Sequence, residues 1–173
     1  MRVVAVLGLV LSILAIPVLC AVGESPQTRL PVTGTVLAVV SPCELDVMIT
    51  RSSVDDGLEV GSVVRLVYRE LVAPGRFDEF YMEAYDLHWI LTSDREIFFE
   101  PASPIVDEEK RWPAYVYLDP NGFGLVSAFL LASGLVTIDP ALEPENDTAQ
   151  LLLDIAAAAE DAGIGRWAKP KQD

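Results

Sequence analysis

Beyond its N-terminal apolar stretch, this sequence has one cysteine, Cys43, and one histidine, His88. Both residue types are suited to nucleophilic chemistry. A thiolate activated by a neighbouring imidazole is a strong nucleophile in acyl transfer. However, His88 lies far from Cys43 in the sequence, and no neighbouring residue is placed to orient its ring. We therefore favour a buried, unreactive Cys43 over a Cys/His site, and we expect His88 to pack at the edge of the core.

The N-terminus has the layout of a secretory signal peptide. Arg2 precedes an unbroken apolar stretch over residues 3–22, which ends in small residues and is followed by polar ones. We predict a signal peptide over residues 1–23 and one domain over residues 24–173, located outside the cytoplasm as a secreted or periplasmic protein. An uncleaved membrane anchor is the alternative, because the apolar stretch approaches the roughly 20 residues of a membrane span.

The chain is strongly acidic, with a formal net charge of -14 at pH 7. Removing the leader takes away Arg2 and no acidic residue, so the domain alone carries about -15. Non-specific affinity for DNA or RNA comes from clustered Lys and Arg side chains on phosphates, and such clusters are scarce here. The charge therefore disfavours nucleic acid as a partner, and favours a protein or another component of the cell envelope.

Hydrophobic periodicity predicts the order strands, helix, strands, helix, helix. Strands are expected at residues 30–40, 45–49, 60–68, 96–99 and 114–118. Helices are expected at residues 77–91, at 125–135, and from an N-cap at Asn146 to a stop at Gly163. A short basic tail, with Arg166, Lys169 and Lys171, is expected to be solvated.

Several local strings, together with this order, resemble the staphylococcal nuclease (thermonuclease) family over nearly all of the domain. The string RWPAYVYL at residues 111–118 resembles the family's Gly-Arg-x-x-Ala-Tyr-Val-Tyr, with Lys110 in place of the glycine. The segment 125–135 resembles a family helix that ends in Gly-Leu, and residues 165–167 resemble the closing Gly-x-Trp. The resemblance implies an α+β, mainly β fold: a five-stranded OB-type barrel with about three helices.

The same resemblance implies where chemistry would take place. The family cuts nucleic acids with a divalent cation held by carboxylates, usually calcium, with a glutamate that handles the attacking water and with two arginines on the phosphate. At the first carboxylate position this sequence has Cys43 in place of a metal-binding aspartate. At the second position Pro74 matches the proline of the family's string. Val72 stands where the family has a metal-binding carboxylate, and Gly75 stands where it has the glutamate. The metal ligands and the general base of the family are therefore missing.

The two arginines are better preserved than the carboxylates. Arg111 matches the family's position, whereas Arg65 lies two residues too far from Pro74, and Arg69 is an alternative to it. We expect Arg111 and Arg65 to mark vestigial phosphate-binding positions.

Other carboxylates near these positions leave room for a rearranged metal site. Glu44 could act as a displaced ligand, although a solvated turn residue is the favoured interpretation. Asp78, Glu79 and Glu83 could also rebuild a site, but they first indicate the acidic start of a helix. We expect no cofactor, and Ca2+ only if the site has been rearranged.

Three functions follow from these features. The leading expectation is an exported binding module that has lost catalytic activity. The alternative is a secreted metal-dependent nuclease with a rearranged active site. A hydrolase that uses the thiol of Cys43 is the third.

Overall fold

The computed structural model describes residues 30–168, apart from residues 54–57, 69, 102–110 and 145. The predicted signal peptide, its boundary at residue 23 and Arg69 therefore lie outside the described residues. Within the described ranges, no helix is both long enough and apolar enough to cross a membrane.

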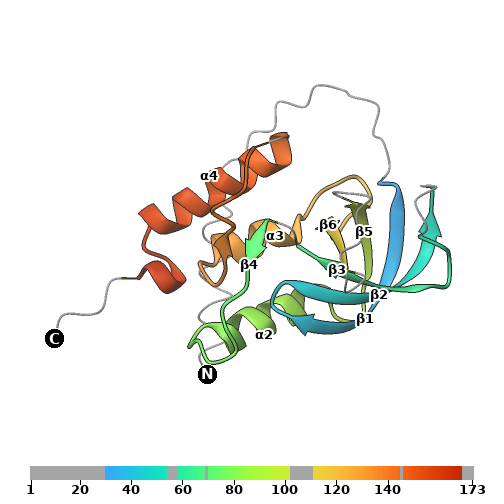
Figure 1. Cartoon of the computed structure of the whole chain (residues 1–173), viewed down its shortest axis with the longest axis horizontal. Helices are drawn as coiled ribbons and strands as arrows, with labels where there is room; N and C mark the ends of the chain where they lie inside the picture. Colours follow the sequence, from blue (N-terminus) through green and yellow to red (C-terminus); the bar gives the residue numbers. More distant parts are fainter. Residues whose placement is uncertain (1–29, 54–57, 69, 102–110, 145, 169–173) are drawn as a thin grey trace.

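Five strands close into a barrel in the order β1-β2-β3-β6-β5 (Figure 1). Their bounds are β1 Val32–Ser41, β2 Glu44–Ser52, β3 Val63–Val67, β5 Glu96–Pro101 and β6 Arg111–Tyr117. Paired strands run antiparallel except β3 and β6, which are parallel. Helix α2 (Tyr81–Thr92) follows β3 in the chain and precedes β5. The closed five-stranded barrel confirms the predicted fold class, α+β and mainly β, with an OB-type barrel.

Alternation along β2 separates the barrel interior from its surface. Leu45, Val47 and Ile49 are almost fully buried. Glu44 and Asp46 alternate with them and stay partly accessible, because successive side chains of a strand point to opposite faces. The same alternation that builds the core therefore places Glu44 and Asp46 on the outside of the barrel.

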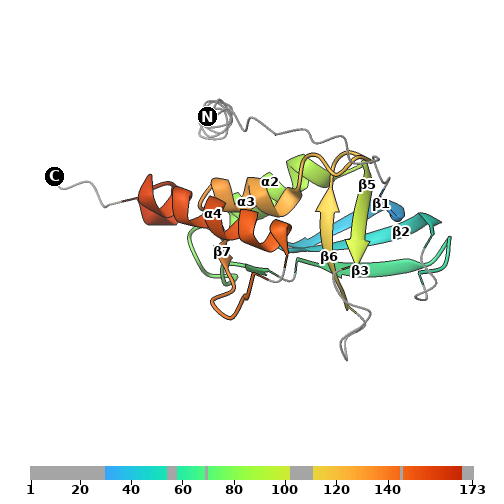
Figure 2. The same ribbon diagram turned by 90° about the horizontal axis from the view of Figure 1, so that it is seen from above.

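The helices gather at one end of the barrel, as two perpendicular views show (Figures 1 and 2). Helix α2 contacts β1, while α3 (Val126–Ala132) contacts β6, α2 and α4 (Asp147–Asp161). The predicted cap of α4 is confirmed, since the side-chain oxygen of Asn146 accepts the N–H of Ala149 at 2.8 Å. The predicted stop is confirmed as well, because Gly163 has a φ of 63° just after the last turn.

Two local features differ from the sequence-based expectations. Helix α2 begins at Tyr81 rather than at residue 77, because the Asp78 carboxylate accepts the N–H of Phe80 at 2.9 Å and holds a turn there. A separate two-stranded sheet pairs β4 (Leu71–Val72) with β7 (Thr137–Ile138). Strands of two residues are too short to show a hydrophobic period, so the sequence does not reveal them.

The C-terminal segment is also more ordered than a solvated tail. Arg166 lies in a short 3-10 helix, Gly165–Trp167, and its Nη2 donates to Oδ2 of Asp78 at 3.0 Å. Its guanidinium group lies 5.9 Å from the centre of the Phe80 ring. The expectation of a solvated Arg166 was therefore wrong, while Lys169 and Lys171 lie outside the described residues.

Candidate functional site

Four charged side chains meet on the outside of the barrel where β2, β3 and β6 are neighbours. We call Glu44, Asp46, Arg65 and Arg111 the charged cluster. In the strand register Asp46 is the partner of Arg65, and Arg65 is the partner of Arg111. The structure thus brings the predicted residues Glu44, Arg65 and Arg111 together, although the three come from separate parts of the sequence.

Each arginine of the charged cluster is paired with a carboxylate. Arg65 donates from Nε and Nη2 to both oxygens of Asp46, at 2.8 and 3.1 Å. Arg111 donates from Nη1 to Oε1 of Glu44 at 3.3 Å. The side chains of Arg65 and Arg111 are 42% and 33% exposed, so water screens both pairs and each stabilises the fold by about 1 kcal/mol at most. The pairs also bear on phosphate binding, because each carboxylate neutralises the positive charge of the arginine that a phosphate would bind.

Asp46 is a member of the cluster that the sequence-based reasoning missed. Its signal is the alternation Glu44-Leu45-Asp46-Val47, which predicts that both carboxylates lie on one face of the strand. What the alternation cannot provide is the register between β2 and β3, which decides that Asp46 faces Arg65.

The first carboxylate position of the resemblance is occupied by a buried thiol. Cys43 lies in the turn between β1 and β2 and is 4% exposed. Burial, and to a smaller extent the negative charge of Glu44, raise the pKa of its thiol to about 12. A neutral, buried thiol is a poor ligand for calcium, which prefers oxygen. Cys43 is therefore buried as expected, and it supplies no carboxylate to this turn.

Labelling of Cys43 with a thiol-specific disulfide reagent should be slow in the native protein. At pH 8 we expect a rate at least about 100-fold lower than in concentrated guanidinium chloride, because the thiolate is both rare and shielded. The chain from residue 24 has no other cysteine, so the absorbance change reports on this thiol alone. Native labelling at the rate of an unfolded control would contradict burial and would revive a thiol-based hydrolase.

The second carboxylate position lies on the small β4–β7 sheet and not on the barrel. Val72 is 43% exposed and pairs with Thr137, while Gly75 is exposed three residues after β4. Glu70, just before β4, is a carboxylate that the sequence-based reasoning missed. It is 1% exposed, and its carbonyl oxygen accepts the N–H of Asp139 at 2.8 Å. Glu70 is close enough to Tyr117 that its negative charge contributes to the raised pKa of that phenol, after burial and Glu100.

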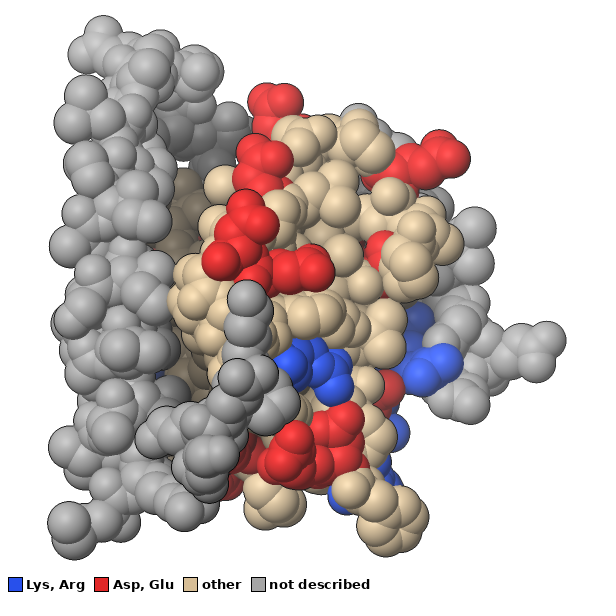
Figure 3. Space-filling view, turned by 90° about the vertical axis from the view of Figure 1, so that its left-hand side faces the viewer, with Lys and Arg blue, Asp and Glu red and all other residues tan. Residues whose placement is uncertain are grey.

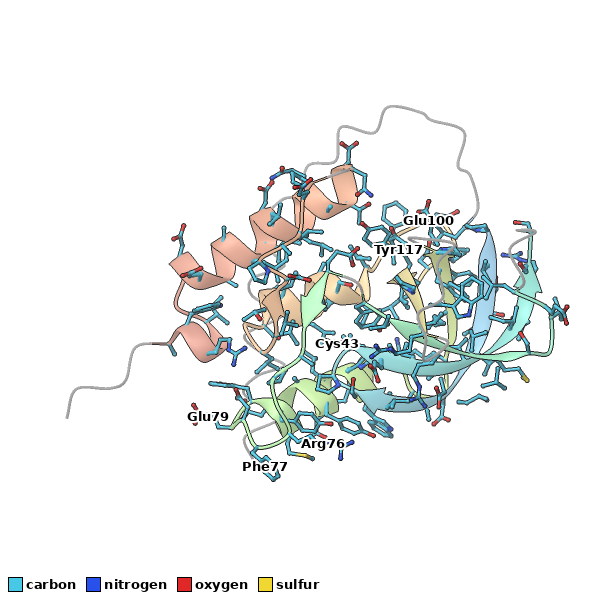
Figure 4. The ribbon with its side chains drawn as sticks, in the orientation of Figure 1. Cys43, Arg76, Phe77, Glu79, Glu100 and Tyr117 are labelled. Carbon is cyan, nitrogen blue, oxygen red and sulfur yellow. The ribbon has the colours of Figure 1, made fainter. Side chains whose placement is uncertain are left out.

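The other predicted carboxylates do not assemble into a metal site. Asp78 is engaged by Arg166, and Glu79 and Glu83 are exposed. Figure 4 shows Glu79 at the outer edge of the molecule, well away from Cys43. Among the described residues, no group of three or more His, Cys, Asp and Glu side chains is arranged to hold a metal ion.

His88 is held by two hydrogen bonds deep in the core, which corrects the expectation that nothing orients it. Its Nδ1–H donates to the carbonyl oxygen of Ser41 at 2.9 Å, because a carbonyl can only accept. Nε2 then accepts the hydroxyl proton of Tyr68 at 2.7 Å. Burial lowers the pKa of His88 to about 4, although the hydrogen bond to Ser41 opposes the shift. The ring is therefore neutral at pH 7, and its hydrogen bond to Ser41 links α2 to the end of β1.

No nucleophilic site forms around Tyr68, which is hydrogen-bonded to both Cys43 and His88 in the core. The N–H of Tyr68 donates to the carbonyl oxygen of Cys43 at 3.1 Å. Burial raises the pKa of Tyr68 well above its ordinary value, and Cys43 raises it further. With the thiol protonated and the imidazole neutral, no thiolate–imidazolium pair forms at pH 7.

The arrangement as a whole is an OB-type barrel with two neutralised arginines on its surface and no carboxylate at Cys43 or Val72. Its charged side chains on β2, β3 and β6 form ion pairs with one another. In comparison with known proteins, the chain matches no protein-family model and no curated protein, so its resemblance to the thermonucleases stays a prediction.

Proposed function

We propose that this chain is an exported, thermonuclease-like OB-type domain that binds a protein partner and has no phosphodiesterase activity. The observation that carries the proposal is the state of the charged cluster. Arg65 and Arg111 are paired with Asp46 and Glu44, while Cys43 and Val72 stand where metal carboxylates would be needed.

The size of the missing contributions explains why the arginines alone cannot sustain catalysis. A bound metal ion and a general base each contribute several kcal/mol of transition-state stabilisation, and a factor of ten in rate corresponds to about 1.4 kcal/mol. An arginine can hold a phosphate but cannot activate water. It would also have to leave its carboxylate first.

The acidic surface supports a protein partner over nucleic acid. With a formal net charge of -14, the chain repels polyanions at long range and attracts cationic surfaces. In a space-filling view of the end that carries the helices, acidic side chains form several groups and basic side chains are fewer (Figure 3). Charge complementarity of this kind accelerates encounter and rejects partners of the same sign.

A secreted nuclease with a rearranged site is the second candidate, because Glu44, Asp46, Arg65 and Arg111 do come together on neighbouring strands. The two candidates are separated by an assay for hydrolysis of single-stranded DNA and RNA in Ca2+, Mg2+ or Mn2+. A binding module releases no nucleotides in any metal. A rearranged nuclease releases them and loses that activity on Glu44→Gln or Arg111→Ala.

A further inference from the structure

The outer face of helix α2 exposes large apolar side chains beside carboxylates. The inner face is buried through Ala84, Leu87, His88 and Thr92. On the outer face Met82, Trp89 and Ile90 are 60%, 50% and 38% exposed. A surface helix of a globular protein normally carries polar side chains on its outer stripe. Three large apolar side chains exposed on one helix face are more than the isolated ones that a surface normally carries, and such a group marks a candidate interaction surface.

Phe77 is a further exposed aromatic residue, four positions before the start of α2. Its side chain is fully exposed, and it points away from the barrel from the turn that precedes the helix (Figure 4). We call Phe77, Met82, Trp89 and Ile90 the α2 patch. Aromatic side chains and methionine are enriched at protein interfaces, because they offer large contact areas and methionine adapts its shape.

Negative charge lies within the α2 patch as well as beside it. Residues 76–96 contain six carboxylates and two arginines. Asp86 lies four residues after Met82 and three before Trp89, so it is exposed on the same side of the helix as both. Glu79 and Glu83 are also exposed, while Asp78 is already paired with Arg166. A surface that combines apolar side chains with carboxylates complements an amphipathic ligand that carries basic side chains beside its apolar ones.

We propose that the α2 patch binds a basic, amphipathic segment of a protein partner, an inference that rests on the proposed binding function. A segment with apolar side chains at helical spacing would cover Met82 and Trp89, and its lysines or arginines would pair with Glu83 and Asp86. The charge disfavours two other occupants. A second copy of this chain would bring like carboxylates together, and an anionic membrane would be repelled.

The test uses a fluorescently labelled helical peptide of leucine and lysine, with its leucines on one face, and the chain from residue 24 onward. The described residues contain the whole barrel with its own core, so this chain is expected to fold. Fluorescence anisotropy should show saturable binding that weakens with salt. Trp89→Ala should raise the Kd by about 10-fold, as expected for a central aromatic residue of an interface. The double variant Glu83→Lys/Asp86→Lys should raise it as well.

Matched variants elsewhere on the surface provide the controls. Phe123→Ala removes another aromatic side chain, which is 62% exposed in the turn after β6. Glu160→Lys/Asp161→Lys makes the same charge reversal at the exposed end of α4. Both should leave the Kd within about twofold, since surface changes outside an interface contribute little. Circular dichroism confirms that each variant is folded.

Four outcomes would overturn the α2 patch as this binding site. The first is that the peptide shows no saturable binding, and the second is that the α4 variant weakens binding as much as the α2 variant does. The third is that a leucine–glutamate peptide binds more tightly than the leucine–lysine one. The fourth is that the chain binds phosphatidylglycerol vesicles instead of the peptide. Dimers that Trp89→Ala dissociates would identify a second copy as the occupant and would also overturn it. The proposed function is tested separately by the hydrolysis of nucleic acid, and none of these outcomes depends on that assay. Failure of the docking site is therefore distinguishable from failure of the proposed function.

Discussion

Lowering the pH from 7 to 4 should destabilise the folded protein by about 3 kcal/mol through His88 alone. The pKa of His88 is about 4 in the folded protein, against 6.5 for an unperturbed histidine. Between these values the unfolded chain binds the proton and the folded one does not. The stabilisation is therefore fully present above pH 6.5 and is lost as the pH falls towards 4. Urea unfolding curves at intervals of half a pH unit measure the slope.

His88→Gln is the matched control for this prediction. Glutamine can still donate to the carbonyl oxygen of Ser41 and accept from the hydroxyl of Tyr68, but it does not titrate. All carboxylates are common to both proteins, so the difference between their profiles isolates His88. We expect the two free energies of unfolding to converge by about 3 kcal/mol on acidification. Parallel profiles would show that His88 is not held neutral in the core.

Gly165→Ala should lower the free energy of unfolding by about 3 kcal/mol. Gly165 has a φ of 59°, which disfavours a side chain. A Cβ atom there would also lie 2.5 Å from the carbonyl oxygen of Gly134 and 2.6 Å from that of Ser133. These contacts are with backbone, so they cannot be relieved by a rotamer change. The close approach of Gly165 to residues 133–134 lets the 3-10 helix pack against the end of α3. There the N–H of Arg166 donates to the carbonyl oxygen of Gly134 at 3.0 Å.

Gly75→Ala provides the comparison for Gly165→Ala. A Cβ atom at Gly75 would meet nothing within 4 Å beyond its chain neighbours, and Gly75 does not have a positive φ. The substitution should be neutral or should stabilise the protein slightly, because alanine restricts the unfolded chain. Thermal unfolding followed by circular dichroism compares both variants with the parent. Equal melting temperatures for Gly165→Ala and the parent would show that the C-terminal segment does not dock on α3.

The barrel was predictable because its signals are local. Alternation in β1 and β2, the breaks between strands and the Asn146 cap each depend on residues within a few positions of one another. The β4–β7 pair has no such signal, since it joins Leu71 to Ile138 through two-residue strands. The contact between Arg166 and Asp78 has none either, because it forms between distant segments only once the helices have packed.

Three members of the charged cluster, Glu44, Arg65 and Arg111, were predictable, but Asp46 and the ion pairs were not. The resemblance singled out Arg65 and Arg111, and the parallel register of β3 and β6 does place them side by side. That both are neutralised depends on the register of β2 against β3 and on the reach of Glu44, which no local pattern encodes. The orientation of His88 was missed for the same reason, because Ser41 and Tyr68 approach it only in the closed barrel.

These features are consistent with the proposed binding function. The core and its buried His88–Tyr68 pair fix the barrel, and the arginines are engaged in ion pairs with their neighbours. The outer side of α2 exposes Met82, Trp89 and Ile90 beside two carboxylates. We therefore expect Trp89 to affect partner binding, whereas Arg111 should affect it little.

Hydrolysis of nucleic acid by the chain from residue 24 tests the absence of catalysis most directly. Single-stranded DNA and RNA are incubated separately with Ca2+, Mg2+ and Mn2+, and acid-soluble nucleotides are measured beside Arg111→Ala and a blank that contains metal alone. A binding module gives the rate of the blank in every metal, for the parent and for Arg111→Ala alike. Metal-dependent release by the parent that Arg111→Ala abolishes would contradict the proposal and would establish a rearranged nuclease at the charged cluster.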